Sequence, residues 1–189
     1  MKKKEESHII NIYLVRHGEA AQSWATASDS PLSGLGKKQA DLVATGFSGS
    51  VLSLVTSPML RARQTAIPLS HKWDTDVHIE DCFREIPSDA EEKNRRLWLN
   101  QIFQKKWDMV DSKLQSWRED AFKGILQKDM DTVIFTHFML INAVVSRITE
   151  RDELVVFQPD NASITHLQIT DRKTASVIKL GKEKETIIN

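Results

Sequence analysis

Cysteine is almost absent from this sequence, with Cys82 the only one among 189 residues. A single thiol excludes an internal disulfide framework, a CxxC redox pair and a thiolate zinc cluster. Long apolar runs are also lacking, since no stretch approaches the about 18 residues that indicate a membrane-spanning helix. The apolar run at residues 8–15 stops at Arg16 and His17 and is too short for a secretory signal. We therefore expect a cytoplasmic protein that does not engage a membrane.

Net charge is lacking too, because 26 Lys and Arg residues balance 26 Asp and Glu residues. This balance argues against a nucleic-acid partner, which a basic surface would serve, although a local positive pocket stays compatible with it. Hydrophobic residues at 40% and charged residues at 28% are typical of a globular protein. We find no repeat, no low-complexity segment and no interior linker rich in Gly, Pro or Ser. The length therefore predicts one domain over residues 8–181, with flexible tails at 1–7 and 182–189.

Strand and helix patterns alternate along the chain. Residues 9–15 form a continuous apolar run typical of a strand that is buried on both faces. Further strands are predicted at 51–56, 77–79, 131–136, 162–169 and 175–180, and helices at 33–45, 59–73 and 138–148. Ser33 is suited to cap the first helix, and Pro68 should kink or split the second.

This order predicts an α/β fold, a three-layer α/β/α sandwich with a mostly parallel central sheet. The last two strands are close in sequence and should finish the sheet as an antiparallel hairpin. Residues 88–128 interrupt the alternation with a helical insertion in which apolar positions recur every three or four residues. We call this segment the cap. Its Trp98, Trp107 and Trp117 are better explained by packing than by ligand binding.

Two histidines, His17 and His137, directly follow predicted buried strands. In open α/β sheets the carboxyl ends of the strands form the ligand-binding edge. Either histidine alone is equally well explained as a satisfied polar residue at a strand end. His17, however, stands between Arg16, whose guanidinium binds oxyanions, and Gly18, which allows close approach of the backbone. The pair of histidines together with Arg16 therefore indicates a phosphate site.

Arg61 adds a second candidate anion ligand. It follows the strand at 51–56 and falls in the first turn of a predicted helix, where backbone N–H groups also favour an anion. Taken alone, Arg61 or Arg63 is more readily explained as a solvated charge on a helix.

These residues resemble the histidine phosphatase superfamily, whose founding members are the phosphoglycerate mutases. An Arg-His-Gly triplet alone is a weak signal. The resemblance is carried by an ordered set of segments that covers most of the chain outside the cap. The segments are Leu14-Val15-Arg16-His17-Gly18-Glu19, Pro31-Leu32-Ser33 with Gly36 and Gln39-Ala40, residues 57–66, Thr136-His137 and Asn161-Ala162-Ser163.

The resemblance implies a phosphoglycerate mutase-like fold and catalysis through a phosphohistidine. It implies that His17 attacks phosphorus and that Glu85 donates the proton to the leaving oxygen. It further implies that Arg16, Arg61 and His137 hold the phosphoryl oxygens, so that no metal and no cofactor is needed. On this view neighbouring arginines keep His17 neutral, and His137 acts best as a cation.

Two features depart from the family pattern and leave alternatives open. Glu85 is followed by Ile-Pro-Ser rather than by a stretch containing glycine, so Asp81 or Asp89 remains an alternative proton donor. Near Ser23 many relatives carry an asparagine that helps to bind phosphate. Here Gln22 or Ser23 must serve, because each can donate a hydrogen bond.

Substrate selection should come from the cap and from the loop at residues 20–30. Trp24 on this loop is a candidate for stacking on a substrate, with packing as the alternative. Four basic residues near the proposed site either favour a substrate with a second anionic group or form a solvated helix face. They are Arg84, Lys93, Arg95 and Arg96.

The leading hypothesis is a hydrolase that acts on a small phosphomonoester. An isomerase that returns the phosphoryl group to its substrate is the first alternative, and a binding or adaptor domain without turnover is the second. A phosphohistidine protein is a further candidate substrate, which an open, flat site would favour. The sequence leaves the oligomeric state open.

Overall fold

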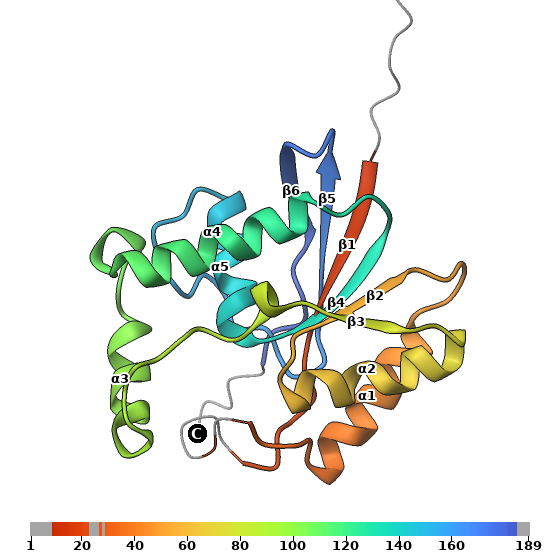
Figure 1. Ribbon diagram of the computed structural model, residues 1–189, viewed down its shortest axis with the longest axis horizontal. Helices are drawn as coiled ribbons and strands as arrows, with labels where there is room; N and C mark the ends of the chain where they lie inside the picture. The colour runs from red at the N-terminus through yellow and green to blue at the C-terminus, as the bar shows by residue number, and fades with distance from the viewer. Residues whose placement is uncertain (1–8, 23–26, 28, 185–189) are drawn as a thin grey trace, which may run out of the picture.

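A single mixed sheet forms the centre of the computed structural model, which describes residues 9–22, 27 and 29–184 (Figure 1). The strand order is β3-β2-β4-β1-β5-β6. The first four strands of this order run parallel, β5 is antiparallel to β1, and β6 is antiparallel to β5. The mostly parallel sheet and the closing hairpin are therefore as predicted. The strands are β1 (Ile9–Arg16), β2 (Ser53–Thr56), β3 (Val77–Ile79), β4 (Thr132–Thr136), β5 (Ile164–Thr170) and β6 (Thr174–Lys179).

Helices cover both faces of the sheet and complete the three layers (Figure 1). Helices α1 (Gly34–Gly46) and α2 (Leu60–Trp73) pack on one face, and α4 (Ser112–Leu126) and α5 (Phe138–Ile148) on the other. Alternation along β1 sends Ile12 and Leu14 toward α5, and sends Val15 toward α1 and α2. Burial on both sides explains the continuous apolar run that marks this strand.

Helix α2 is not split by Pro68, which lies inside the continuous helix Leu60–Trp73. Of the two expected effects, a kink or a split, the split is therefore wrong. Ala66 and Leu69, on either side of the proline, are buried against the sheet, so tertiary packing offsets the hydrogen bond that proline cannot donate. The predicted cap of α1 is present, since the Ser33 Oγ accepts a hydrogen bond from the N–H of Gly36 at 2.9 Å.

The cap contains the short helix α3 (Arg95–Ile102) and the longer α4, and α3 lies beside the carboxyl edge of the sheet (Figure 1). Trp107 is buried in a small apolar core that joins the cap to α5, and its indole N–H donates to the Ser146 Oγ at 2.9 Å. The Trp117 indole donates to the carbonyl of Arg84. Both tryptophans therefore pack, as predicted.

The carboxyl-terminal segment departs from the sequence-based prediction. Residues 182–184 were expected in a flexible tail, but they pair with residues 158–160. The Asp160 N–H donates to the Lys182 carbonyl at 2.7 Å, and the Lys184 N–H donates to the Gln158 carbonyl at 3.0 Å. The tail prediction is therefore wrong for these three residues, because backbone pairing fixes charged residues that the composition assigns to solvent.

Two glycines allow the loop after β1 to lie directly on the first turn of α1. A side-chain carbon added to Gly36 would lie 2.0 Å from the backbone oxygen of Glu19, and one added to Gly18 would lie 2.5 Å from the Gly36 oxygen. Both obstacles are backbone atoms, which cannot swing aside. The contact therefore holds the chain that follows His17 in a fixed position.

We expect Gly36→Ala to lower the free energy of unfolding by about 1–3 kcal/mol, because the added methyl overlaps the Glu19 backbone. Gly34→Ala is the matched control on the same helix, since an added carbon there meets no atom within 4 Å. It should raise stability by about 0.4–1 kcal/mol. Urea denaturation measures both. Equal effects of the two substitutions would contradict the close approach.

Candidate active site

Three adjacent parallel strands end at one place, and each end carries a polar residue. Arg16 and His17 end β1, His137 follows β4, and Ser57 follows β2. The backbone keeps the ends in register, because the His17 N–H donates to the Thr136 carbonyl at 2.9 Å, and the Ser57 N–H to the Phe135 carbonyl at 2.9 Å. The sheet therefore brings the predicted residues to the edge where α/β folds bind ligands.

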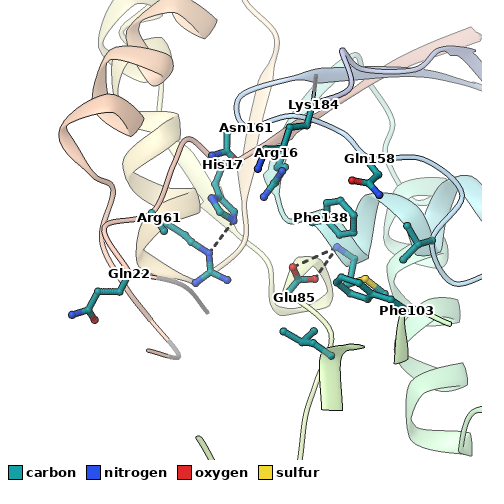
Figure 2. A pocket seen from close by; sticks show the side chains of 14 residues that line it. Arg16, His17, Gln22, Arg61, Glu85, Phe103, Phe138, Gln158, Asn161 and Lys184 are labelled. Carbon is teal, nitrogen blue, oxygen red and sulfur yellow. Dashed lines mark hydrogen bonds between the residues drawn. The ribbon is translucent and has the colours of Figure 1, made fainter. Parts of the chain in front are cut away.

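A cavity of about 410 Å³ opens at this edge (Figure 2). Five of the predicted site residues line it, namely Arg16, His17, Gln22, Arg61 and Glu85. Ser23, also predicted to bind phosphate, and Trp24 lie outside the described residues. His137 does not line the cavity in this structure and is fully buried beside it.

His17 is held as one particular neutral tautomer. Its Nδ1 lies 2.7 Å from the carbonyl oxygen of Gly18, which can only accept, so Nδ1 carries the proton. Its Nε2 accepts a hydrogen bond from the Arg61 Nε at 3.0 Å (Figure 2). A guanidinium can only donate, so Nε2 presents a lone pair. The ring nitrogen of His17 that carries no proton is therefore Nε2.

Burial of His17 lowers the pKa of its imidazole well below the ordinary value, and the positive charges of Arg61 and Arg16 lower it further. The hydrogen bond to the Gly18 carbonyl opposes this shift. Only 7% of the residue is exposed. His17 is therefore neutral at physiological pH, as the sequence analysis expects of a nucleophile.

Two arginines border the imidazole. Arg61, in the first turn of α2, is buried on the floor of the cavity. Arg16 donates through Nη1 to the carbonyl of Pro159 at 2.7 Å, and its guanidinium lies 5.3 Å from the centre of the Phe138 ring. Its Nε is buried and has no hydrogen-bond partner among the described residues. Such a donor has hydrogen-bonding capacity left for an oxyanion ligand.

Glu85 faces the two arginines across the cavity (Figure 2). Its Oε1 accepts hydrogen bonds from the backbone N–H groups of Ile86 at 3.0 Å and Met139 at 3.1 Å. Burial raises the pKa of the carboxyl above its usual range, while these hydrogen bonds and the charges of Arg61 and Arg16 partly oppose the rise. A carboxyl with a raised pKa is better suited to donate a proton near neutral pH.

The two alternative proton donors are far less suited. The Asp81 side chain is 83% exposed and pairs with Arg84, and the Asp89 side chain is 84% exposed and pairs with Lys113. Neither residue lines the cavity. Among the three acidic candidates the geometry therefore favours Glu85.

His137 differs from the expectation of a cation. Burial, together with the charges of Arg61, His17 and Arg16, lowers the pKa of its imidazole well below the ordinary value, so the ring is neutral in the free protein. Its Nε2 lies 2.7 Å from the Ser57 Oγ, and its Nδ1 is buried with no hydrogen-bond partner among the described residues. The ring centres of His137 and His17 are 5.2 Å apart.

The sequence analysis did not predict several residues at the site, and it predicted the role of Gln22 differently from its observed position. Figure 2 shows the side chain of Gln22 pointing away from His17, in contrast to its predicted role. Thr65 was not singled out, although its Oγ1 accepts from the Gly18 N–H and donates to the Arg61 carbonyl. Its position four residues after Arg61, on the same face of the predicted helix, could have indicated that it lies at the site. Leu99, Phe103, Phe138, Val155, Gln158 and Lys184 also line the cavity and carried no recognisable motif.

The segment 159–163 closes the remaining side of the site. Ala162 adopts a left-handed conformation with φ of 59°, which is uncommon for a residue other than glycine. In this conformation its N–H donates to the carbonyls of Arg16 and His17, at 3.0 and 3.3 Å. The local strain therefore holds Asn161 at the cavity wall, next to the proposed phosphate ligands.

The described residues contain neither a metal cluster nor a membrane-spanning helix. Within them, no group of three or more His, Cys, Asp or Glu side chains is placed to hold a metal ion. No helix in the described part of the chain has the length and apolar character needed to cross a membrane.

A parallel sheet with histidines at the ends of two adjacent strands and arginines beside them defines a class of phosphate-handling α/β proteins. The pattern of the histidine phosphatase superfamily (branch 1) matches residues 12–179 of this chain. The protein therefore belongs to this superfamily, as the sequence motifs predicted, and the phosphoglycerate mutase-like fold is confirmed.

Individual relatives are more distant. The probable phosphoglycerate mutase GpmB of Photorhabdus laumondii is 31% identical over 121 residues, 61% of this chain and 51% of that protein. The chain thus spans about half the length of this relative. The phosphoserine phosphatase of Entamoeba histolytica, solved with 3-phosphoglyceric acid, has a TM-score of 0.75 at 21% identity, covering 93% of this chain and 98% of that one. The α-ribazole phosphatase of Shigella flexneri has a TM-score of 0.70 at 19% identity, covering 95% of this chain and 100% of that one. At these identities the two structures establish the fold alone.

The buried neutral histidines predict a pH-dependent stability. Unfolded histidine has a pKa of about 6.5, whereas burial lowers the pKa of both His17 and His137 in the folded state. Below about pH 6.5 the unfolded chain therefore binds more protons, and the free energy of unfolding should fall as the pH is lowered. Each histidine contributes up to about 1.4 kcal/mol per pH unit. Urea denaturation of wild type and of His17→Gln between pH 7.5 and 5.5 should give a shallower slope for the variant. Identical slopes would contradict a depressed pKa for His17.

Proposed function

We propose that this protein is a cofactor-independent phosphatase that hydrolyses a small phosphomonoester through a phosphohistidine on His17. The observation that carries the proposal is the Nε2 lone pair of His17, which is oriented by the Gly18 carbonyl and bordered by two arginines, with Glu85 across the cavity. A neutral nucleophile, fixed cations and a carboxyl of raised pKa are the three groups that such a reaction needs.

In the first step the Nε2 of His17 attacks phosphorus, and the bond from phosphorus to the ester oxygen breaks. Glu85, protonated, gives its proton to the departing oxygen, and the alcohol leaves. Arg16 and Arg61 bind the charge that spreads over the equatorial oxygens in the transition state. In the phosphohistidine, phosphorus is bonded to Nε2, while the N–H at Nδ1 still donates its hydrogen bond to the Gly18 carbonyl.

In the second step a water molecule attacks the phosphohistidine and Glu85 takes the proton of that water. The bond from Nε2 to phosphorus breaks and inorganic phosphate is released. His17 returns to its original tautomer and Glu85 to its protonated form, so the cycle closes with no other reactant.

His137 fits this scheme as a neutral donor. With the Ser57 hydroxyl donating to its Nε2, its Nδ1 carries the proton, and this buried N–H has no partner among the described residues. An unsatisfied buried donor lowers the stability of the protein. A phosphoryl oxygen that accepts from this N–H would therefore remove that free-energy cost on binding. Binding of the dianion also favours the protonated ring, which offsets the pKa depression in the free protein.

The main alternative is a mutase that returns the phosphoryl group to its substrate. Such an enzyme must keep water from the phosphohistidine, whereas exposed residues, among them Gln158, Lys184 and the 41%-exposed Phe103, line the mouth of this cavity. Access for water favours hydrolysis. Two solved structures whose likeness extends over more than nine-tenths of this chain are also named phosphatases. Walls contributed by α3 of the cap favour a small molecule over a phosphoprotein.

Hydrolysis of a phosphomonoester in excess chelator tests the proposal. His17→Ala should abolish turnover, because the variant lacks the imidazole nitrogen that would form the bond to phosphorus. Glu85→Gln should lower kcat by about 10²–10⁴-fold for an alkyl phosphate, whose alkoxide needs a proton, and much less for 4-nitrophenyl phosphate.

Asp89→Asn is the matched control for the acid, because it changes a nearby carboxyl that is exposed and lies outside the cavity. It should leave both rates unchanged. A phosphoenzyme trapped by acid quench from wild type, and missing from His17→Ala, gives the direct readout. Turnover that survives His17→Ala would overturn the mechanism, and its complete absence from wild type would favour the binding domain.

A further inference from the structure

The part of the cavity beyond Glu85 is walled by hydrocarbon. Glu85 lies between His17 on one side and the rings of Phe103 and Phe138 on the other (Figure 2). The wall is drawn from α3, the start of α5 and the segment before β5. We call it the apolar wall, and its members are Leu99, Phe103, Phe138, Met139 and Val155.

Backbone and ring contacts fix the apolar wall next to the proton donor. The N–H of Met139 holds the Glu85 carboxylate at 3.1 Å, so the group that would protonate the leaving oxygen sits against the wall itself. The Phe138 ring packs 5.8 Å from that of Phe103 and lies under the Arg16 guanidinium. An ester oxygen within reach of Glu85 therefore directs its carbon chain along these side chains.

Charge is distributed unevenly around the cavity. The cations among its described lining residues are Arg16, Arg61 and Lys184. The first two lie beside His17, and Lys184 is exposed at the mouth. None of the four basic residues that the sequence suggested for a second anionic group, which are Arg84, Lys93, Arg95 and Arg96, lines the cavity. A charged group on the first carbons of the alcohol would therefore lose hydration without a partner.

We propose that the apolar wall selects phosphomonoesters of apolar or aromatic alcohols over those of charged alcohols such as serine or glycerate. This inference rests on the proposed phosphatase function and names its substrate class. A hydrocarbon surface that becomes buried when an ester binds against it gives transition-state binding energy to an apolar chain and withholds it from a charged one. The substrate class would then differ from the compounds named with the Entamoeba histolytica relative.

The test compares esters whose chemistry at phosphorus is matched. Both 2-phenylethyl phosphate and phosphoserine are esters of primary alcohols, so a difference in kcat/KM reports recognition rather than leaving-group reactivity. We expect wild type to favour 2-phenylethyl phosphate by about 10²-fold or more, since rejection of a charged group by an apolar site is strong. A preference for phosphoserine would overturn the inference while leaving the phosphatase function intact.

Two leucines on α3 provide a matched pair of variants. Leu99 lines the cavity, whereas Leu97 on the same helix is 62% exposed and does not. Leu99→Ala should lower kcat/KM for 2-phenylethyl phosphate about tenfold. It should lower kcat/KM for glycerol phosphate much less, so that the losses for the two esters differ clearly. Leu97→Ala should change none of these values. Equal losses for both esters in Leu99→Ala would mean that the wall supports the fold and not selection.

Binding of two phosphonates separates this inference from the proposed function. In 3-phenylpropylphosphonate and 2-amino-4-phosphonobutanoate a carbon replaces the ester oxygen, so neither can be hydrolysed. Calorimetry should show tighter binding of the phenyl compound, and Leu99→Ala should reduce the difference. If the protein gives that result but shows no turnover, the selectivity of the apolar wall is supported and the proposed phosphatase function is rejected. Tighter binding of the amino acid analogue would reject the apolar wall whatever the turnover.

Discussion

The hydrogen bond from the Arg61 Nε to the His17 Nε2 is the interaction on which the site depends. It works only if the imidazole is neutral, and burial of the ring between arginines ensures that state. The Thr65 hydroxyl then ties the two partners together, because it accepts from the loop after His17 and donates to the helix that carries Arg61. The fold is consistent with this requirement, since β4 ends beside β1 and β2 ends beside β4, which places α2 against His17.

Much of the architecture was predictable, for identifiable physical reasons. The run at residues 9–15 is apolar without alternation because β1 lies at the centre of the sheet with helices on both faces. Ser33 caps α1 as expected because its short side chain reaches the N–H of Gly36. His17, Arg16 and Arg61 were predictable as neighbours, since each follows or closely follows a parallel strand and such strand ends converge.

What could not be predicted depends on contacts between distant segments. The apolar wall joins Phe103, Phe138 and Val155, and no local pattern tells that three apolar residues so far apart share one cavity. The lowered pKa of His137 in the free protein could not be predicted, because its burial follows from packing and not from its neighbours in sequence. Gln22 was selected for its hydrogen-bonding capacity, but side-chain direction in a loop follows from tertiary contacts (Figure 2). Pro68 is tolerated in α2 because the sheet buries the residues around it.

The pairing of residues 182–184 with 158–160 determines where a label can be attached without reaching the cavity. It draws the chain after β6 back to the mouth of the cavity, where Lys184 is a lining residue. Ile9, at the other end of the described chain, starts β1 at the amino edge of the sheet, the edge opposite the cavity. A label attached near Ile9 would therefore lie away from the cavity mouth, whereas one attached at Lys184 would lie at it.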